Sequence, residues 1–569
     1  MYILATNITS PIGNTTTENY QAVSQGVSAI RCHAEGEELP FPHASSLFSD
    51  EQWKMMAIDG CSRFESLVIQ SVRESLSHTS IDVKSERVVL ILSTTKGDTV
   101  SMPFDDGGVM LGDTARHIAD ELGIVTTPIV VCNACISGAS AQILADRLLA
   151  NKTYDYAIVT GADVQGPFIM SGFHALMALS PQPCRPFDEE RIGLNLGEAA
   201  ATMIMAAGDI PAGVGMPRMI AGAVRNDAYH ISSPHPKGEG CYKALEVVKR
   251  SVDTEEIACV GVHGTATMYN DQMESKAIER AGLSDVPLSA LKGYYGHTMG
   301  AAGLLEGILM LEGIRHGEVL PSKGFRERGV SGKVTISSDM LSVQKKKAIK
   351  MLSGFGGGNA AIAYDMGGDT HLPCVAVRPG LTRSHSVRIT ETEIVVDGRK
   401  MPNSTRGRDM LTDIYKEHIG DYPKYYKMDT LARLAFVASE LLLKAERDDN
   451  PDSMQHDEDR AVIFFNRSGS IVSDSKFFSS IRTAEEYFPS PAVFVYTLPN
   501  ISVGEIALRN GYHGETSFYV LHEKSDTLMD KVLRASFQDA DTRSIIGGWI
   551  DCTSDEEFEC EISIILPNG

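Results

Sequence analysis

The sequence predicts an α/β fold with at least two units, because strand-like and helix-like segments alternate along a chain too long for one hydrophobic core. The chain has 569 residues, of which 43% are hydrophobic. A helical pattern at 64–76 precedes a buried-strand pattern at 87–93, and the helical pattern after residue 135 precedes another strand at 156–161. A third strand-like run, at 259–263, ends in a loop. This alternation is typical of α/β folds.

Composition and charge exclude several classes of protein. The 22% of charged residues and the absence of low-complexity segments indicate a globular protein. The formal charge of −22 argues against general affinity for nucleic acids or anionic membranes. No apolar run approaches the length of a membrane span, and no basic segment opens the N-terminus, so we expect a soluble cytoplasmic protein. Ten cysteines without zinc-ligand spacing predict a reduced compartment and no structural metal.

Cys135 lies where a strand-like apolar stretch gives way to small residues and then to a helical pattern at 141–150. A thiol at such a corner faces the unpaired N–H groups and the positive dipole end of the following helix, which favour the thiolate. The alternative is a buried structural cysteine, since free cysteine is among the most buried residue types. The segment by itself leaves both interpretations open.

Two histidines and a glycine cluster add candidate functional positions. His263 ends a strand and opens the loop 263–267, and His297 lies in a glycine-containing segment before a helical pattern. Loops of this kind often hold catalytic groups, although each histidine alone could be a hydrogen-bonded structural residue. The cluster at 353–359 lacks the Lys-Ser/Thr ending of a phosphate-binding loop. Two loop histidines together with a candidate thiolate favour catalysis.

Residues 1–366 resemble a β-ketoacyl-acyl-carrier-protein synthase, the elongating condensing enzyme of fatty acid and polyketide assembly. The segments that carry the resemblance follow the order of the family: 9–14, 133–138, 184–188, 194–199, 263–274, 292–306 and 353–359. The resemblance implies a thiolase-like layered αβαβα fold. The presence of two histidines favours an elongating enzyme over a degradative thiolase, which would carry a second cysteine, and over an initiating synthase, which would carry His and Asn.

The resemblance also implies a role for each motif residue. Cys135 would carry the acyl group, His263 and His297 would hold the enolate oxygen formed from a malonyl group, and the backbone N–H groups of Cys135 and Phe355 would form an oxyanion hole. The implied catalytic residues are Cys135, His263, His297, Lys292 and Glu306, and the implied substrate-binding residues are Phe355, Thr265, Thr267 and Gly356. No metal and no other cofactor is implied.

Three positions depart from the family pattern. Asn133 stands where Thr is usual, Ala199 where Gly is usual, and Ser353 where the gate loop usually has its first Phe. None removes a catalytic atom, but Ser353 puts the acyl-chain preference in doubt. The segment Lys-Gly-Tyr-Tyr-Gly-His at 292–297 resembles the corresponding segment of synthases from aryl-polyene and related pigment pathways.

The sequence divides into a catalytic domain at 1–366, a linker at 367–385 and a second unit at 386–569. The second unit is predicted to begin with a hairpin at 393–400. It then repeats the order of helix-like and strand-like segments of the first unit. Residues 427–434, 460–465 and 544–551 echo three segments of the N-terminal half, so we expect a degenerate half-copy of the synthase fold. It has no cysteine at 508–523, where the equivalent of Cys135 would lie, and His522 there is expected to be solvated. The unit is expected to be a structural or partner-binding appendage that packs on the synthase or on another subunit.

The expected partners are acyl carrier protein, loaded with acyl or malonyl groups, and a second synthase-like subunit in a homodimer or heterodimer. Candidate basic residues for carrier-protein docking are Lys54, Arg63, Arg147 and Lys152. The alternative function is a non-catalytic assembly subunit that resembles a chain-length factor and partners an active synthase.

Overall fold

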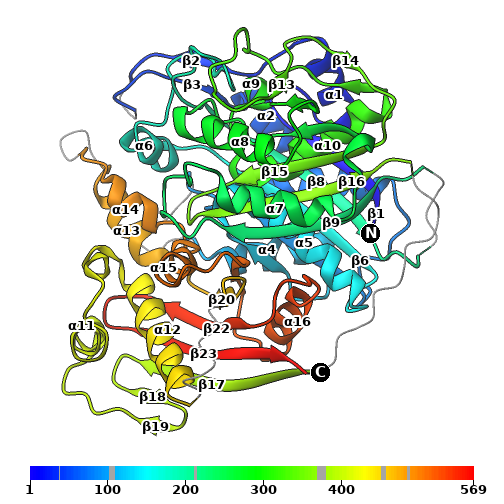
Figure 1. Ribbon diagram of the computed structural model, residues 1–569. Helices are drawn as coiled ribbons and strands as arrows, with labels where there is room; N and C mark the ends of the chain where they lie inside the picture. Colours follow the sequence, from blue (N-terminus) through cyan, green and yellow to red (C-terminus); the bar gives the residue numbers. More distant parts are fainter. Residues whose placement is uncertain are drawn as a thin grey trace.

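The computed structural model describes residues 1–36, 39–100, 109–210, 215–367, 380–449, 457–482 and 487–568 (Figure 1). Its first sheet is built from the N-terminal half of the catalytic domain. The strand order is β1 (Tyr2–Thr9), β8 (Ala199–Ala206), β6 (Tyr156–Asp163), β4 (Val88–Ser93) and β5 (Ile129–Val131). β4 is buried throughout, which explains its continuous apolar sequence.

The second sheet of the catalytic domain lies against the first, with helices between them. Its strand order is β9 (Arg218–Asn226), β16 (Gly358–Asp365), β15 (Lys347–Ser353), β10 (Ile257–Gly261), β11 (Pro287–Ser289) and β13 (Thr335–Ile336). α5 (Ser137–Ala150) and α10 (Ala302–Arg315) contact both sheets. They approach closely because glycine stands at the contact: a Cβ at Gly303 of α10 would lie 2.6 Å from the Ala139 nitrogen of α5.

Helices cover the outer faces of both sheets. α3 (Arg63–Ser77) packs on the first sheet, and α7 (Glu239–Lys249) packs on the second and also contacts α8 (Met268–Arg280). α3 begins with a capping box between Ser62 and Glu65, which satisfies the free N–H groups of its first turn. The order of layers is therefore helix, sheet, helix, sheet, helix, and the predicted layered αβαβα fold is confirmed.

Shorter elements complete the catalytic domain. The remaining helices are α1 (Thr16–Ser24), α2 (Asp50–Met56), α4 (Leu111–Leu122), α6 (Pro167–Ala175) and α9 (Lys292–Tyr295). The remaining strands are β2 (Arg31–His33), β3 (His43–Ser46), β7 (Leu196–Gly197), β12 (Glu318–Val319) and β14 (Leu341–Ser342). No helix in the described ranges has both the length and the apolar character needed to cross a membrane.

The C-terminal unit repeats the strand pairings of the first sheet. Its strand order is β17 (Leu381–Thr390), β23 (Phe558–Pro567), β22 (Ile545–Cys552), β20 (Ala461–Asn466) and β21 (Thr516–Val520). The first two pairs are antiparallel and the last two parallel, as in β1, β8, β6, β4 and β5. The unit thus begins at Leu381, inside the linker expected at 367–385, most of which lies outside the described residues.

The helices of the C-terminal unit lie mainly on one face of its sheet. They are α11 (Gly407–His418), α12 (Thr430–Asp449), α13 (Ile471–Ser479), α14 (Pro491–Tyr496), α15 (Ile501–Asn510) and α16 (Asp526–Ser536). α12 packs across β17, β22 and β23, whereas α16 contacts α5 of the catalytic domain. The hairpin expected at 393–400 is formed by β18 (Ile394–Val396) and β19 (Arg399–Lys400), with Asp397 and Gly398 at positive φ in its turn.

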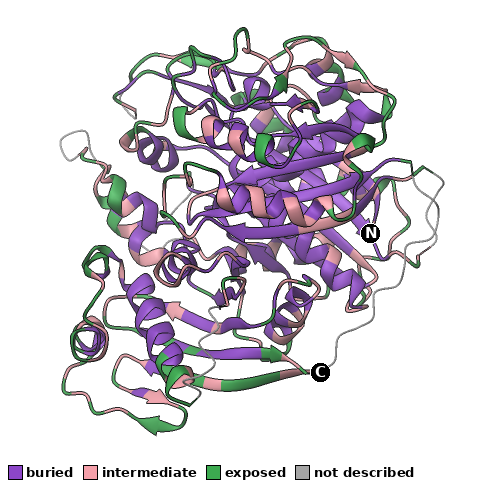
Figure 2. Ribbon diagram, in the orientation of Figure 1, coloured by how far each residue is buried: buried purple, intermediate pink, exposed green. Residues whose placement is uncertain are grey.

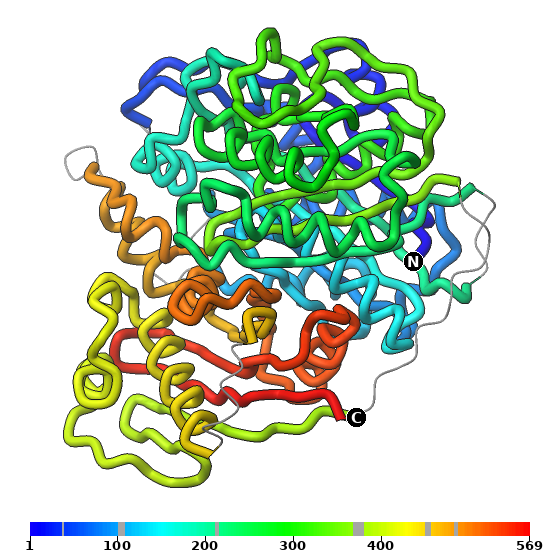
Figure 3. Tube along the Cα trace, viewed as in Figure 1, coloured from blue at the N-terminus to red at the C-terminus, as the bar shows by residue number. Residues whose placement is uncertain are grey.

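The two units share one continuous sheet, because β21 pairs antiparallel with β5. The C-terminal unit lies below the catalytic domain in Figures 1 and 3. Val131 is opposite Tyr519. The Cys132 N–H donates to the Phe518 carbonyl at 3.0 Å, and the Phe518 N–H donates to Asn133 Oδ1 at 2.7 Å. Asn133, which stands where Thr is usual, thus has a side-chain amide that accepts a hydrogen bond from the other unit.

On the sheet face of the C-terminal unit that α12 does not cover, apolar side chains such as Phe465 and Trp549 are buried in one cluster with α16 and α5. Exposed positions on this unit lie along β17 and β23 (Figure 2). Along β23, Phe558, Cys560 and Ile562 are buried in the cluster with α12, while Glu559 and Glu561 between them are exposed. Glu561 accepts a hydrogen bond from Lys524 at 2.7 Å. An exposed apolar face would invite aggregation, and the charges on β23 together with the layer formed by α16 remove that liability.

Buried ion pairs fix the junction of the units at a second place. Arg147 Nη1 lies 2.5 Å from Glu515 Oε2, and Arg225 binds both carboxylate oxygens of Asp539 at 2.6 and 3.1 Å. Arg147 and Arg225 are 5% and 2% exposed. The interpretation of Arg147 as a carrier-protein docking residue is therefore wrong, because its guanidinium group is buried against the C-terminal unit.

The Asp539→Ala variant should lower the free energy of unfolding by about 3–5 kcal/mol, because it leaves the buried Arg225 guanidinium without its bidentate partner. Urea unfolding followed by circular dichroism measures this. The Asp155→Ala variant, which removes the exposed partner of Arg87, is the control and should cost under about 1 kcal/mol. Equal losses in the two variants would contradict the assignment of a buried interdomain ion pair.

Candidate active site

Cys135 lies at the strand-to-helix corner that the sequence predicts. β5 ends at Val131, a single turn of 3₁₀ helix spans Ala134–Ile136, and α5 begins at Ser137. Ala134 has a φ of 47°, a left-handed conformation that is strained for a residue with a Cβ. The Ser137 hydroxyl accepts from the Asn133 N–H at 2.8 Å and donates to the Ala134 carbonyl at 2.6 Å. These bonds hold the turn that presents the thiol.

Burial dominates the ionisation of Cys135, which is 6% exposed. Burial raises its pKa to about 12, with a smaller contribution in the same direction from Asp163. Lys292 and the backbone N–H groups of Cys135 and Phe355 lower the pKa by less. Desolvation therefore outweighs the groups that favour the thiolate at this corner.

His297 presents a proton donor to the cavity. Its Nδ1 accepts a hydrogen bond from the Met299 N–H at 3.2 Å, so in the neutral ring the proton is on Nε2. Nε2 is buried and has no hydrogen-bond partner among the described residues. Burial, followed by Lys292 and Lys350, lowers the pKa of His297 well below its usual value. The ring is therefore neutral at physiological pH, with a free N–H group.

His263 is held in the same tautomer by Lys292. The Lys292 ammonium lies 3.3 Å from His263 Nδ1 and donates to the His263 carbonyl at 2.6 Å. An ammonium has no lone pair and can only donate, so His263 Nδ1 accepts and its Nε2 carries the proton. Burial, followed by Lys292, lowers the pKa of His263 well below its usual value.

Glu306 compensates two buried lysines. Its Oε1 lies 2.7 Å from Lys292 Nζ, and its Oε2 lies 2.6 Å from Lys350 Nζ. Sequence reasoning missed Lys350, which is 1% exposed in β15 and donates to the Val262 carbonyl at 2.8 Å. The available signal was a lysine within the otherwise apolar buried run 348–352.

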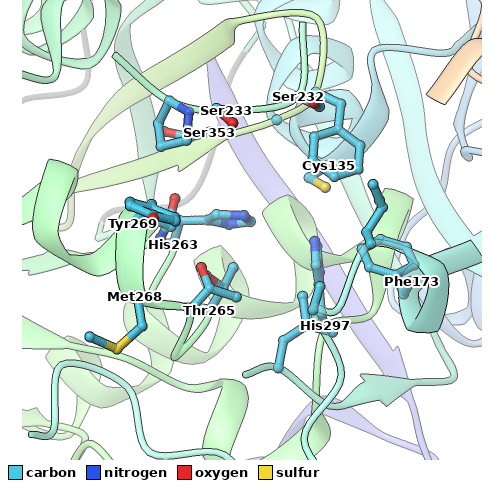
Figure 4. Close-up of a pocket in the computed structure, with 18 of the residues that line it drawn as sticks. Cys135, Phe173, Ser232, Ser233, His263, Thr265, Met268, Tyr269, His297 and Ser353 are labelled. Atoms are coloured by element: carbon cyan, nitrogen blue, oxygen red, sulfur yellow. The ribbon is translucent and has the colours of Figure 1, made fainter. Parts of the chain in front are cut away.

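The thiol and the two imidazoles converge on one point (Figure 4). Cys135 Sγ and one ring nitrogen from each of His263 and His297 all lie within 4.8 Å of one another, and the rings are 5.0 Å apart between centroids. A thiolate and two imidazoles could also ligate a metal such as Zn²⁺. A second set with this potential in the described part of the chain is Cys61, Glu65 and His117.

A cavity of about 420 Å³ opens from these three side chains to the surface, and is large enough for a small-molecule substrate. Thr265, Thr267 and Phe355 line it, as predicted, and so does Ser353. Gly356 is absent from its lining and packs instead against the C-terminal unit, where a Cβ would lie 2.7 Å from Asn500 Nδ2. The predicted substrate contact of Gly356 is therefore replaced by a contact between the units.

Two family models match the chain. Beta-ketoacyl synthase, N-terminal domain, matches residues 2–209, and Beta-ketoacyl synthase, C-terminal domain, matches residues 218–326. Together they cover more than half of the 569 residues. The chain belongs to the β-ketoacyl synthase family.

The chain aligns with curated relatives over only part of their length. The 3-oxoacyl-[acyl-carrier-protein] synthase 2 of Vibrio cholerae is 32% identical over 230 residues, which cover 38% of this chain and 56% of that protein. Nodulation protein E of Rhizobium leguminosarum bv. trifolii is 27% identical over 257 residues, which cover 44% of this chain and 64% of that protein. The chain thus spans less than two thirds of each of these relatives.

The chain is also similar in fold to solved structures, and one of these similarities covers its whole length. The PfaC keto synthase-chain length factor aligns with a TM-score of 0.73 at 14% identity, and covers 100% of this chain and 78% of that one. The ketosynthase ApeO in complex with its chain length factor ApeC, from Xenorhabdus doucetiae, has a TM-score of 0.53 at 24% identity over 64% of this chain and 97% of that one. The first likeness includes the C-terminal unit.

Two buried carboxylates hold the loops around the site by accepting hydrogen bonds from backbone N–H groups. Glu274 accepts the N–H groups of His263 and Gly264, each at 2.7 Å, and burial raises its pKa to about 7. Asp163 accepts the Gly300 N–H at 2.6 Å, and burial raises its pKa to about 6. His522 lies outside the cavity lining, is partly exposed and bonds to Asp113 at 2.7 Å.

The raised pKa of Cys135 predicts its alkylation kinetics. Iodoacetamide reacts with the thiolate, so the rate should rise about tenfold per pH unit between about pH 7 and 9, without a plateau. Mass spectrometry of the modified peptide measures the rate, with the exposed Cys32 as an internal control for reagent access. A plateau below about pH 8 would show a stabilised thiolate and contradict this assignment.

Proposed function

We propose that the chain is a β-ketoacyl-acyl-carrier-protein synthase, which joins an acyl group on Cys135 to a malonyl group carried by acyl carrier protein. The observation that carries this proposal is the convergence of one thiol and two neutral imidazoles, each with a proton on Nε2, at one end of a substrate-sized cavity. The reaction converts an acyl thioester, a malonyl thioester and one proton into a β-ketoacyl thioester, carbon dioxide and a free carrier-protein thiol.

The first step transfers the acyl group to the enzyme. Cys135 Sγ attacks the carbonyl carbon of the acyl thioester, the bond to the carrier-protein sulfur breaks, and the thiol proton passes to the departing thiolate. The backbone N–H groups of Cys135 and Phe355, which face Sγ, stabilise the oxyanion that forms during the attack. The turn held by Ser137 keeps the Cys135 N–H group in place.

The second step forms the carbon–carbon bond. The malonyl carboxylate leaves as carbon dioxide, and its bonding electrons move into the thioester to give an enolate. The Nε2–H groups of His263 and His297 donate hydrogen bonds to the enolate oxygen. The enolate carbon then attacks the acyl-Cys135 carbonyl and expels the Cys135 thiolate, which takes up a proton from solvent.

Lys292, Lys350 and Glu306 support this step without contacting the substrate. Lys292 donates to Nδ1 of His263 and so keeps the proton on Nε2. Glu306 neutralises part of the charge of the two lysines. The remaining positive charge disfavours protonation of both rings and attracts the developing enolate.

Acyl carrier protein is the proposed partner of the cavity mouth. Met177, Ile192, Met268 and Tyr269 line the cavity and are each more than half exposed, so the rim presents apolar contacts to an incoming carrier. One structural neighbour is a type II PKS acyl-carrier protein in complex with its ketosynthase. Lys54, Arg63 and Lys152 stay predictions as docking residues, and the pigment-type pathway also stays a prediction.

We also propose that the C-terminal unit, a half-copy of the synthase fold, takes the place of a second subunit. The matching strand pairings and the likeness of the whole chain to a keto synthase-chain length factor support this. Pairing with another synthase-like subunit stays a prediction, but the free edge of β5 is occupied by β21 of the same chain. A second subunit would have to use another face.

Cys135→Ala should abolish acyl loading from acyl carrier protein and lower the condensation rate by roughly 10³-fold or more, because the covalent intermediate cannot form. Mass spectrometry of the Cys135 peptide measures acyl loading, and mass spectrometry of the β-ketoacyl-carrier-protein product measures condensation. Cys132→Ala, which removes a neighbouring buried thiol, is the matched control and should retain both. If the wild-type chain takes up no acyl group, the alternative of a non-catalytic chain-length-factor-like subunit gains support.

A further inference from the structure

A cysteine, a glutamate and a histidine meet in the outer helical layer of the catalytic domain. They are Cys61, Glu65 and His117, which we call the outer set, and one ligand atom of each lies within 4.8 Å of the other two. None of them lines the cavity of Cys135. Glu65 and His117 are 52 residues apart, so spacing in the sequence does not reveal the set. The packing of α3 against α4 brings it together.

A tight turn presents Cys61 beside the first turn of α3. The Cys61 N–H donates to the Ile58 carbonyl at 3.1 Å, and Gly60 has the left-handed φ of 78° that this turn requires. Ser62 then caps α3, and its own N–H donates to Glu65 Oε2 at 2.8 Å. The turn and the cap therefore fix the positions of Cys61 and Glu65, and the cap does not use Oε1 of Glu65.

His117 completes the outer set from α4. Its Nδ1 lies 2.8 Å from Glu65 Oε1. The His117 side chain is 43% exposed, so ions from solvent reach the ring. Two ligands of a tetrahedral Zn²⁺ lie roughly 3.3–3.8 Å apart, so small rotations of these side chains place the sulfur, a carboxylate oxygen and a ring nitrogen around one ion.

Acidic groups around the outer set favour a cation. Burial raises the pKa of the Cys61 thiol, and the charges of Glu65 and Glu121 raise it further. The hydrogen bond to Glu65 raises the pKa of His117, and the charge of Glu121 adds to this effect. The potential is therefore negative at both the thiol and the ring, and a bound divalent cation would compensate it.

Glu121 is placed to be a fourth ligand. It follows His117 by four residues on α4, so the two side chains share one face of the helix. Its partner is Arg73, at 3.7 Å, and both side chains of this ion pair are more than a third exposed. An exposed ion pair contributes little free energy, so the carboxylate of Glu121 is available to a metal.

We propose that the outer set, together with Glu121, binds one Zn²⁺ ion that connects α3 to α4. A thiolate with an imidazole and carboxylates suits Zn²⁺ better than Mg²⁺ or Ca²⁺, which prefer oxygen ligands. On binding, an S–Zn bond replaces the S–H bond of Cys61, and the proton passes to solvent. Four side chains fill a tetrahedral shell, so the site is structural. It goes beyond the proposed synthase function and replaces the expectation of no structural metal.

The ion would fix a helix that contacts both units. In α4, a Cβ at Gly112 would lie 2.5 Å from the Leu521 carbonyl oxygen of the C-terminal unit, and Asp113 bonds to His522 at 2.7 Å. α4 also packs on β5, the strand that leads to Cys135. Zn²⁺ at the other end of α4 therefore stabilises an element of the junction.

Zn²⁺ alone is the probe, and the Cys135→Ala chain is the background, because the catalytic cluster could also ligate a metal. After treatment with EDTA, this chain should bind one Zn²⁺ with a Kd of about 1 μM or below, measured by competition with a chromophoric chelator. Co²⁺ in its place should give the charge-transfer absorption of a thiolate ligand. Cys61→Ser should remove this absorption, and both Cys61→Ser and His117→Gln should weaken Zn²⁺ binding roughly 100-fold or more. Glu121→Gln should weaken it by about tenfold, because water can replace the fourth ligand.

Matched variants separate loss of a ligand from loss of structure. Glu65→Gln keeps a residue that can form the capping box with Ser62, and it should still weaken Zn²⁺ binding about tenfold or more because a neutral amide is a poorer ligand. His78→Gln removes a histidine that forms an exposed pair with Glu74 at the end of α3, and Cys32→Ser removes an exposed thiol. Both controls should leave the Kd unchanged.

Alkylation tests the site in the wild-type chain without any substitution. Zn²⁺ should slow the reaction of Cys61 with iodoacetamide at least about tenfold, because the metal engages the sulfur, and should leave Cys32 within about twofold. Absence of tight Zn²⁺ binding to the Cys135→Ala chain, or an unchanged Kd in both Cys61→Ser and His117→Gln, would overturn the proposal. Acyl loading of Cys135 is measured separately, so neither result bears on the synthase function.

Discussion

The antiparallel pairing of β5 with β21 is the constraint on which the rest of the structure depends. It joins two sheets into one and fixes the strand that leads directly into Cys135. Asn133 extends the pairing beyond the strand end, because its side chain bonds to Phe518 and Ser517 across the junction. The corner that presents the thiol is thus supported by the catalytic domain on one side and by the C-terminal unit on the other. One chain supplies both sides of this turn.

Burial sets the chemistry of the site. Desolvation raises the pKa of Cys135 and lowers the pKa values of His263 and His297, so the resting site holds a thiol and two neutral rings. Two buried lysines share one carboxylate, and this arrangement leaves positive charge behind the rings. That charge makes the histidines donors and poor bases. A site of this kind suits stabilisation of an enolate oxygen better than abstraction of a proton.

The C-terminal unit is stable as half of a layered fold because a helix and exposed charges take the place of a second sheet on one face. In the catalytic domain, α5 and α10 separate two sheets and are buried on nearly all sides. In the C-terminal unit, α16 and α5 bury apolar side chains of the corresponding sheet face such as Trp549, and β23 carries exposed charges such as Glu559 and Glu561. The other face keeps an apolar layer under α12, continuous with the core of the catalytic domain. The half-copy therefore needs no second sheet, but it does need the junction.

The sequence by itself determined the class of fold, the division into two units and the chemical groups of the site. The apolar periodicity and the motif residues Cys135, His263, Lys292, His297 and Glu306 are local signals, and the structure brings these side chains together as their order in the chain implies. Only the tertiary structure decided the partners that come from distant segments. Asn500 and Phe494 in the other unit and the burial of Arg147 carry no local signature. Lys350 is visible in the sequence only as a lysine in an apolar run, and its partner Glu306 comes from a distant segment. The ionisation state of Cys135 belongs to this second group, since desolvation depends on what packs around the thiol and not on the residues beside it in the chain.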